Sequence, residues 1–180
     1  MRIYGNRLLK TVPGRAVRPT PARVREAVFN IWQGQVAGCR WLDLCAGNGS
    51  MGAEALCRGA SVVVGIEQSG RACGVIRHNW QTIAQPEQQF RLLRGDVRQR
   101  LSNLAGEQFD LIYFDPPYAS ELYLPVLGAI VTLDVLAPSA ELAVEYDPNC
   151  WTPTAISGLE DIRHKTYGNT ALVIYTPTTS

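Results

Sequence analysis

The sequence has no apolar run that approaches the ~20 residues a membrane-spanning helix needs. Its first residues, Met1-Arg2-Ile3-Tyr4-Gly5-Asn6-Arg7, are polar and basic, and they lack the apolar core of a secretory signal peptide. No internal repeat or low-complexity tract is present. These absences argue against a membrane, secreted or repeat protein. A chain of 180 residues is then expected to form one cytoplasmic domain with at most a small appendage.

Metal-binding and disulfide patterns are also lacking. The cysteines are odd in number and none is spaced as CxxC: Cys39, Cys45, Cys57, Cys73 and Cys150. This usage predicts reduced thiols and no zinc site. His78 and His164 have no neighbouring Cys or His and are interpreted as ordinary surface or packing residues. We therefore expect no metal.

The charge is distributed unevenly, although the net charge is only +1. Residues 1–25 contain seven basic side chains and no acidic one, so the remainder of the chain is acidic overall. Six of these seven are arginines, which suit bidentate phosphate contacts. The pattern predicts a basic arm, residues 1–20, that binds a polyanion, followed by a single domain over residues 21–180.

Hydrophobic periodicity predicts alternating strands and helices. Within the arm, short β-like stretches flank a Gly5-Asn6 turn, and Thr20 is the expected N-cap of a helix that ends near Trp32. The expected strands are 41–45, 61–66, 90–94, 110–114 and 140–146, and the expected helices are 51–58, 70–84, 97–104 and 121–134. Such alternation is typical of an α/β fold with a mainly parallel, doubly wound sheet. Residues 160–167 and 170–176 leave no room for a helix and predict an antiparallel hairpin at the sheet edge.

The segment Asp115-Pro116-Pro117-Tyr118 directly follows a predicted buried strand and has the composition of a site for an exocyclic amine. The Asp115 carboxylate can accept a hydrogen bond from the amine. The two prolines stiffen a loop that presents carbonyl acceptors, and Tyr118 can stack on a planar base. The same residues can also simply end a strand and form a turn.

The segment Trp41–Gly52 reads as a strand, a glycine-rich turn and a helix start, which is typical of a nucleoside cofactor site. Gly47 and Gly49 permit close approach of a ligand, and Glu67 ends the next strand, where a ribose-hydroxyl acceptor is needed. Gly47, Gly49 and Gly52 also fit GxGxxG, so these residues alone leave a nicotinamide dinucleotide open.

Two further acids favour S-adenosylmethionine as the cofactor. Asp43 lies four residues before Gly47, where it would attract an ammonium group and repel a pyrophosphate. Asp96 follows the third strand and can accept from an adenine amino group. One ligand that carries an ammonium, a ribose diol and an adenine would satisfy Asp43, Glu67 and Asp96 together. Each acid alone has an ordinary alternative as a helix cap or turn residue.

Taken together, these motifs resemble the bacterial 16S ribosomal RNA (guanine-N2)-methyltransferases of the RsmD type over nearly the whole chain. The resemblance rests on Arg18–Asn30, on Leu42–Leu56 continued by Arg58-Gly59-Ala60, and on Phe109–Tyr118. Cys45 and Asn48 stand where the family more often has Phe and Ser. The resemblance implies a Rossmann-like class I methyltransferase domain with a seven-stranded sheet. It also implies methylation of the 2-amino group of one guanine in 16S rRNA. We expect this RNA to be modified within a small-subunit particle, with naked RNA as the alternative, and we expect the protein to be a monomer.

The site residues are assigned on this basis. The catalytic residues are Asp115, Pro116, Pro117 and Tyr118. The cofactor-binding residues are Asp43, Ala46, Gly47, Gly49, Glu67, Gln68, Asp96, Val97 and Asp115. The RNA-binding residues are Arg18, Arg23 and Arg25, with Thr20 and Asn30 helping to close the pocket.

Three other functions stay open at this point. An adenine-N6 or cytosine-N4 methyltransferase acting on DNA could use the same strand-end chemistry, although no second domain for DNA recognition is visible. A non-catalytic RNA-binding module could retain S-adenosylmethionine as a structural ligand, although the intact Asp115–Tyr118 segment argues against it. A small dehydrogenase is disfavoured by Asp43 and by the absence of an obvious hydride-site acid or base.

Overall fold

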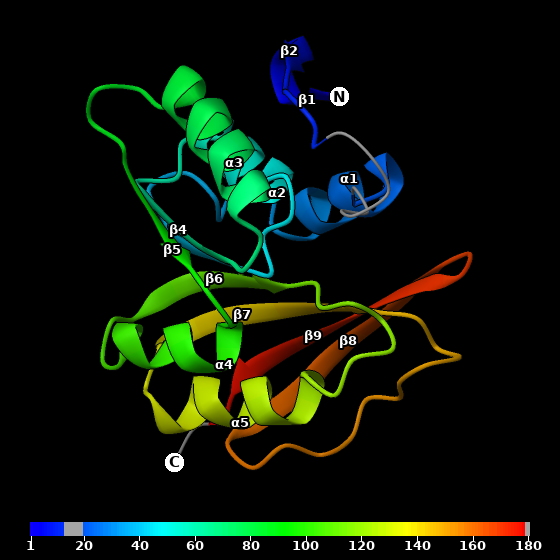
Figure 1. Cartoon of the computed structure of the whole chain (residues 1–180). Helices are drawn as coiled ribbons and strands as arrows, with labels where there is room; N and C mark the ends of the chain where they lie inside the picture. Colours follow the sequence, from blue (N-terminus) through cyan, green and yellow to red (C-terminus); the bar gives the residue numbers. More distant parts are fainter. Residues whose placement is uncertain (13–19, 179–180) are drawn as a thin grey trace.

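The protein folds around one seven-stranded sheet, as seen in a computed structural model that describes residues 1–12 and 20–178 (Figure 1). The strands of this sheet are β3 (Arg40–Leu44), β4 (Val62–Glu67), β5 (Gln89–Arg94), β6 (Phe109–Phe114), β7 (Leu136–Tyr146), β8 (Leu159–Tyr167) and β9 (Thr170–Pro177). The helices are α1 (Ala22–Ile31), α2 (Ser50–Cys57), α3 (Gly70–Ile83), α4 (Val97–Arg100) and α5 (Tyr123–Thr132), with a 3-10 turn, η2 (Leu101–Leu104), after α4.

The sheet separates two hydrophobic cores. Helices α1, α2 and α3 cover one face, and α4 and α5 cover the other (Figure 1). Trp32, Trp41 and Trp80 are fully buried on the first side, whereas Phe109, Phe114 and Tyr123 fill the second. Because both faces of the central strands are covered, those strands are almost continuously apolar, as a buried parallel sheet requires.

The strand order β5-β4-β3-β6-β7-β9-β8 fixes where a ligand site can form. The chain builds outward from β3 to β5 and then returns to place β6 on the other side of β3, in parallel register with it. The carboxyl ends of β3 and β6 therefore lie side by side while the loops that follow them diverge. Open α/β sheets bind ligands at this kind of switch point.

The last two strands add an antiparallel hairpin at one edge. Strand β9 pairs with β7 and β8 pairs with β9, both antiparallel, and Gly168 in the connecting turn has a φ of 64°. The predicted mainly parallel sheet with an antiparallel C-terminal hairpin is thus confirmed. The predicted helix over 97–104 forms as the short α4 followed by η2, and β7 begins earlier than predicted.

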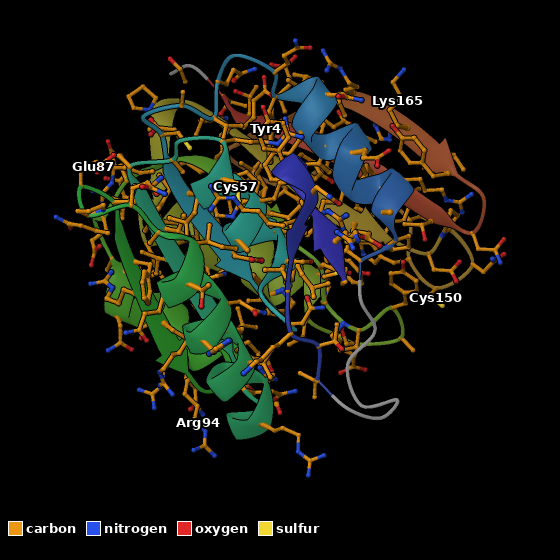
Figure 2. All side chains as sticks on the ribbon, turned by 90° about the horizontal axis from the view of Figure 1, so that it is seen from above. Tyr4, Cys57, Glu87, Arg94, Cys150 and Lys165 are labelled. Atoms are coloured by element: carbon orange, nitrogen blue, oxygen red, sulfur yellow. The ribbon has the colours of Figure 1, made fainter. Side chains whose placement is uncertain are left out.

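The first residues pack on the domain. Strands β1 (Arg2–Ile3) and β2 (Arg7–Leu8) pair antiparallel around η1 (Tyr4–Asn6), with Gly5 and Asn6 at positive φ as expected of the turn. Viewed from above, this hairpin lies across α2, with Tyr4 near Cys57 (Figure 2). Ile3 and Leu9 are buried in the same core as α1, so residues 1–12 are a packed element of the domain.

Helix α1 starts differently from the prediction. The N-cap is Pro21, and no side chain caps the helix, so the expectation that Thr20 caps it is wrong. Val24, Val28, Phe29 and Trp32 form its buried side. Pro13, Gly14 and the rest of residues 13–19 lie outside the described residues.

No helix within residues 1–12 and 20–178 combines the length and the apolar character that are needed to cross a bilayer.

Gly52 allows α2 to pack against Trp80, and replacing it tests this contact. A Cβ at Gly52 would lie 2.4 Å from Cζ2 of Trp80, whose side chain is fully buried. We expect Gly52→Ala to lower the free energy of unfolding by about 1–3 kcal/mol, since an overpacked core must shift. Urea unfolding followed by tryptophan fluorescence measures this.

Gly74 in α3 is the matched control. A Cβ there meets no atom within 4 Å, so Gly74→Ala should be neutral or stabilise the protein by up to ~1 kcal/mol through helix propensity. Equal destabilisation by both substitutions would contradict the packing explanation.

Candidate active site

A cavity of about 520 Å³ opens at the carboxyl ends of the parallel strands. Its lining comes from the loops after β3, β4, β5 and β6, from the end of β7, and from Thr20 and Pro21 just before α1. The size suits a nucleoside-type ligand. The structure brings most of the predicted site residues to its wall: Asp43, Ala46, Gly47, Glu67, Gln68, Asp96, Val97, Asp115, Pro116, Pro117 and Tyr118.

Gly49 does not line the cavity but shapes the turn. It is the N-cap of α2 with a φ of 72°, in the left-handed region that favours glycine. Its carbonyl accepts a hydrogen bond from Nε1 of Trp80 at 2.8 Å. Gly49 therefore holds the glycine-rich turn between β3 and the buried face of α3.

The amides of this glycine-rich turn are engaged by the protein's own acceptors. The Gly47 N–H donates to Oε2 of Glu67 at 2.8 Å, and the Gly52 N–H donates to Oδ2 of Asp43 at 3.0 Å. The Gly49 N–H donates to the Ala46 carbonyl at 2.7 Å. A pyrophosphate at such a turn depends on these donors. With two carboxylates in its place, the turn is arranged for a cationic or hydroxyl-bearing ligand, which counts against the dinucleotide alternative.

Asp43 is 1% exposed and carries an unusual ionisation equilibrium. Burial raises the pKa of Asp43 to about 8, and the nearby Glu67 adds to this, while the Gly52 N–H opposes it. A positive charge in the cavity would favour the ionised carboxylate and lower this pKa. The burial of Asp43 therefore favours its protonated form, and a cation beside it would favour the ionised form.

Glu67 and Asp96 present acceptors from the next two strands. Oε1 of Glu67 accepts from the Ser69 N–H at 2.7 Å, which fixes the carboxylate at the cavity wall. Asp96 caps α4 by accepting from the Arg98 N–H at 2.9 Å, and the Arg98 side chain pairs with it. These hydrogen bonds hold the pKa of Asp96 below its ordinary value, so its oxygens remain acceptors. Asp96 is thus both a helix cap and a cavity residue.

The loop after β6 is stiff and is tied to β3. The Asp115 N–H donates to the Leu44 carbonyl at 3.3 Å, so the pairing of β3 with β6 continues to the first residue of the motif. Pro116 is buried, Pro117 is exposed, and the Ser120 N–H closes a turn onto the Pro117 carbonyl at 2.9 Å. Asp115 is half-buried and lines the same cavity wall as the residues of the glycine-rich turn.

Two residues that contact the Tyr118 hydroxyl were missed from the sequence. Glu145, near the end of β7, is 1% exposed and accepts hydrogen bonds from the hydroxyls of Tyr113 and Tyr118. Thr170, the first residue of β9, lies 2.9 Å from the Tyr118 hydroxyl. An acid within the apolar run Leu142–Tyr146 was the available signal for Glu145. Nothing in the sequence indicated Thr170, because its contact depends on how the hairpin folds back.

The predicted RNA-binding arginines have three different outcomes. Arg18 lies outside the described residues. Arg23 is exposed on the first turn of α1, and its Nη2 donates to the Tyr167 carbonyl at 2.6 Å. Arg25 is 4% exposed, and its Nε pairs with Oε2 of the buried Glu54 at 2.7 Å. This burial contradicts the prediction that Arg25 contacts RNA, because a salt bridge in the core leaves its charge no access to a phosphate.

The predicted role of Asn30 also fails, since this exposed residue does not line the cavity, whereas Thr20 does. As for metals, the described residues contain no cluster of three or more His, Cys, Asp or Glu side chains that could hold an ion.

Comparison with known proteins identifies one family. Residues 1–176 match the family described as "Conserved hypothetical protein 95". YlbH of Bacillus subtilis is 31% identical over 171 residues, covering 94% of this chain and 92% of YlbH. Ribosomal RNA small subunit methyltransferase D of Escherichia coli K12 is 27% identical over 159 residues, covering 88% of this chain and 79% of that protein.

Solved structures agree with the fold. The structure of yhhF from Escherichia coli has a TM-score of 0.86 at 28% identity and covers 100% of this chain and 99% of its own. TrmN from Thermus thermophilus has a TM-score of 0.63 at 17% identity, covering 86% of this chain and 48% of TrmN. The shared architecture is the class I methyltransferase fold.

The raised pKa of Asp43 predicts a pH-dependent stability. An aspartate in the unfolded chain has a pKa of about 4. Burial raises the pKa of Asp43 to about 8 in the folded protein. The stabilising proton is fully present below about pH 4 and is lost as the pH rises to about 8. The free energy of unfolding of the wild type, minus that of Asp43→Asn, should therefore fall between pH 5 and pH 8.5.

Urea denaturation of the ligand-free proteins measures this difference. Asp110→Asn, at an exposed position of β6, controls for loss of a surface charge. A wild-type minus Asp43→Asn difference that stays constant with pH would show that Asp43 is ionised in both states.

Proposed function

We propose that this chain, which belongs to the family described as "Conserved hypothetical protein 95", is an S-adenosylmethionine-dependent RNA methyltransferase whose target is the exocyclic 2-amino group of a guanine in 16S ribosomal RNA. One observation carries the proposal. A single cavity joins a glycine-rich turn whose amides bind carboxylates to the rigid Asp115-Pro116-Pro117-Tyr118 loop. The names of the curated relatives support ribosomal RNA as the substrate class.

The donor set fits S-adenosylmethionine. Asp43 provides a buried carboxyl that favours a cation, Glu67 a fixed acceptor for ribose hydroxyls, and Asp96 an acceptor for the adenine amine. Ala46, Gly47, Gln68 and Val97 complete this wall. When bound, the cofactor supplies an electrophilic methyl group on a positively charged sulfur. The acidic lining stabilises that positive charge, whereas a pyrophosphate would be repelled.

Asp115 and Pro116 orient the amine. The lone pair of a guanine 2-amino nitrogen is delocalised into the ring, so the nitrogen is a weak nucleophile. The Asp115 carboxylate and the Pro116 carbonyl each accept a hydrogen bond from one N–H group of the amine and hold its two hydrogens out of the ring plane. This geometry directs the nitrogen lone pair toward the methyl group. Such positioning can supply about 7–11 kcal/mol. Asp115 also stabilises the positive charge that develops on nitrogen and accepts the proton afterwards.

Tyr118 forms the wall against which the base stacks. An exocyclic amine in a helix is paired or stacked, so the guanine must be extruded before it can reach Asp115. Stacking of a base on an aromatic ring is worth about 1–3 kcal/mol. The Tyr118 ring lines the cavity and its hydroxyl is anchored at its far end, so the ring is available to receive the base.

The basic rim supplies the polyanion contact. Arg23 follows Thr20 and Pro21, which both line the cavity, and its guanidinium contacts the Tyr167 carbonyl; we propose that its charge serves the entrance. Figure 2 places Lys165, on the neighbouring hairpin, at the same margin of the molecule as α1. Arg18 remains part of this proposal from the sequence. We further propose a cytoplasmic monomer that acts on the RNA within a small-subunit particle.

Asp115→Ala tests the catalytic assignment. Turnover should fall at least ~1,000-fold, because the variant loses both the orientation of the amine and the acceptor for its charge. Affinity for S-adenosylmethionine should change less than about threefold, because Asp43, Glu67 and Asp96 remain. Radiolabelled methyl transfer to 16S ribosomal RNA and isothermal titration with the cofactor measure the two quantities.

Asp110→Ala is the matched control on the same strand. Asp110 is exposed and accepts from the Arg40 N–H at the opposite end of the sheet, so activity should be retained. An Asp115→Ala protein with near-normal turnover and lost cofactor binding would assign Asp115 to the cofactor alone.

Arg23→Gln tests the RNA contact. If Arg23 binds a phosphate, the slope of log affinity against log salt concentration should become shallower by about 0.7–0.9. Filter binding of 16S ribosomal RNA over a range of potassium chloride concentrations gives the slope. Arg40→Gln removes a partly exposed arginine at the amino end of β3, far from the cavity, and should leave the slope unchanged. The same slope for Arg23→Gln and the wild type would assign Arg23 to anchoring the Tyr167 turn.

A further inference from the structure

Glu145 is a buried acid to which the proposed chemistry assigns no role. It lies next to the last residue of β7, is 1% exposed, and reaches the cavity wall. Burying a carboxylate costs free energy unless hydrogen bonds compensate for the lost water. Its two oxygens each accept a phenol hydroxyl, from Tyr113 on one side and Tyr118 on the other. Tyr113 lies on β6, and Tyr118 lies on the Asp115–Tyr118 loop that follows it.

The sheet register explains why this acid meets these tyrosines. Tyr113 of β6 pairs with Ala143 of β7, so Glu145 lies one pleat further toward the carboxyl end on the same face. Tyr118 follows on the loop that leaves β6, and its hydroxyl lies 2.8 Å from Oε1 of Glu145. Glu145 is thus hydrogen-bonded to the loop that carries Asp115.

Tyr118 is held from a second direction by the hairpin. Thr170 begins β9, and its Oγ1 lies 2.9 Å from the Tyr118 hydroxyl. Burial raises the pKa of Tyr118 above its ordinary value, and the Glu145 charge adds to this, so the phenol keeps its proton and remains a donor. The Tyr118 hydroxyl donates its proton to Glu145, and its oxygen accepts from the Thr170 hydroxyl. Two partners on two different strands therefore fix one ring that can otherwise rotate about its side-chain bonds.

We propose that Glu145 is a positioning residue that acts through Tyr118, setting the plane on which the target base stacks, with Thr170 as the second anchor. This inference rests on the proposed function, because it concerns the same base-binding wall. A base held against Asp115 requires a wall whose angle does not drift, since small misplacements of reacting atoms cost large factors in rate. Glu145 touches neither the amine nor the cofactor in this account.

A double-mutant cycle tests whether Glu145 acts through Tyr118. Glu145→Gln keeps the size of the side chain but replaces charged acceptors with a neutral amide, and charge-assisted hydrogen bonds are roughly twice as strong. We expect kcat/KM for RNA to fall about five- to tenfold with cofactor affinity unchanged. In a Tyr118→Phe background, Glu145→Gln should cause little further loss, because the hydroxyl through which it acts is gone. Thr170→Val should act in the same non-additive way.

The matched control is Tyr175→Phe. Tyr175 is also a buried tyrosine and lies on β9 with Thr170, and its hydroxyl has no hydrogen-bond partner within the described part of the chain. It should leave kcat/KM and cofactor affinity unchanged. If instead the Glu145→Gln loss persists in full in the Tyr118→Phe background, Glu145 acts by another route and the proposal is overturned.

A readout independent of activity separates this inference from the proposed function. Ring signals of carbon-13-labelled tyrosine identify Tyr118 as the signal that disappears in Tyr118→Phe. Glu145→Gln and Thr170→Val should shift or broaden that signal in the cofactor-free protein, while Tyr175→Phe should not. A wild-type protein that transfers no methyl group to RNA would refute the proposed function, and the ring signal would still decide the positioning role. An unchanged Tyr118 signal in both variants would refute it.

Discussion

The parallel pairing of β3 with β6 is the constraint on which the rest of the site depends. It continues to the hydrogen bond between the Asp115 N–H and the Leu44 carbonyl, so the glycine-rich turn and the Asp115–Tyr118 loop start from adjacent points. Because the strand order reverses here, the two loops diverge and leave a cavity between them. The two halves of a transfer reaction, a group donor and an acceptor amine, can therefore be bound by rigid backbone a short distance apart.

Electrostatics gives this cavity its selectivity. Asp43, Glu67 and Asp96 come from three successive strand ends, and the first two engage the amides that a phosphate would otherwise use. Burying Asp43 here costs free energy, and this burial, helped by the charge of Glu67, raises the pKa of Asp43. A ligand with a positive charge relieves that cost. The same glycine spacing that favours dinucleotides elsewhere thus serves a cationic cofactor, because the residues around the glycines, more than the glycines themselves, determine what binds.

The sequence was sufficient for the parts of the structure that depend on local pattern. Strand and helix alternation predicted the sheet and its terminal hairpin, and acids at strand ends predicted which side chains meet in the cavity. Side chains whose partners come from distant segments were not predictable. Arg25 looked like its exposed neighbours in a basic run, but its partner Glu54 lies on another helix. Thr20 is a residue type that commonly caps helices, yet Pro21 takes the N-cap position of α1. Glu145 gave a weak signal as an acid in an apolar strand, and its partners Tyr118 and Thr170 are brought to it only by tertiary folding.

In the proposed reaction, this cavity brings a sulfonium methyl group to the 2-amino nitrogen of a guanine. The most direct measurement incubates the protein with isotope-labelled S-adenosylmethionine and either small ribosomal subunits or double-stranded DNA, and then identifies the labelled nucleoside by digestion and mass spectrometry. If the proposed reaction is right, label is expected only in N2-methylguanosine from 16S ribosomal RNA. Label in N6-methyladenine or N4-methylcytosine, or no label in any nucleoside despite cofactor binding, would contradict it.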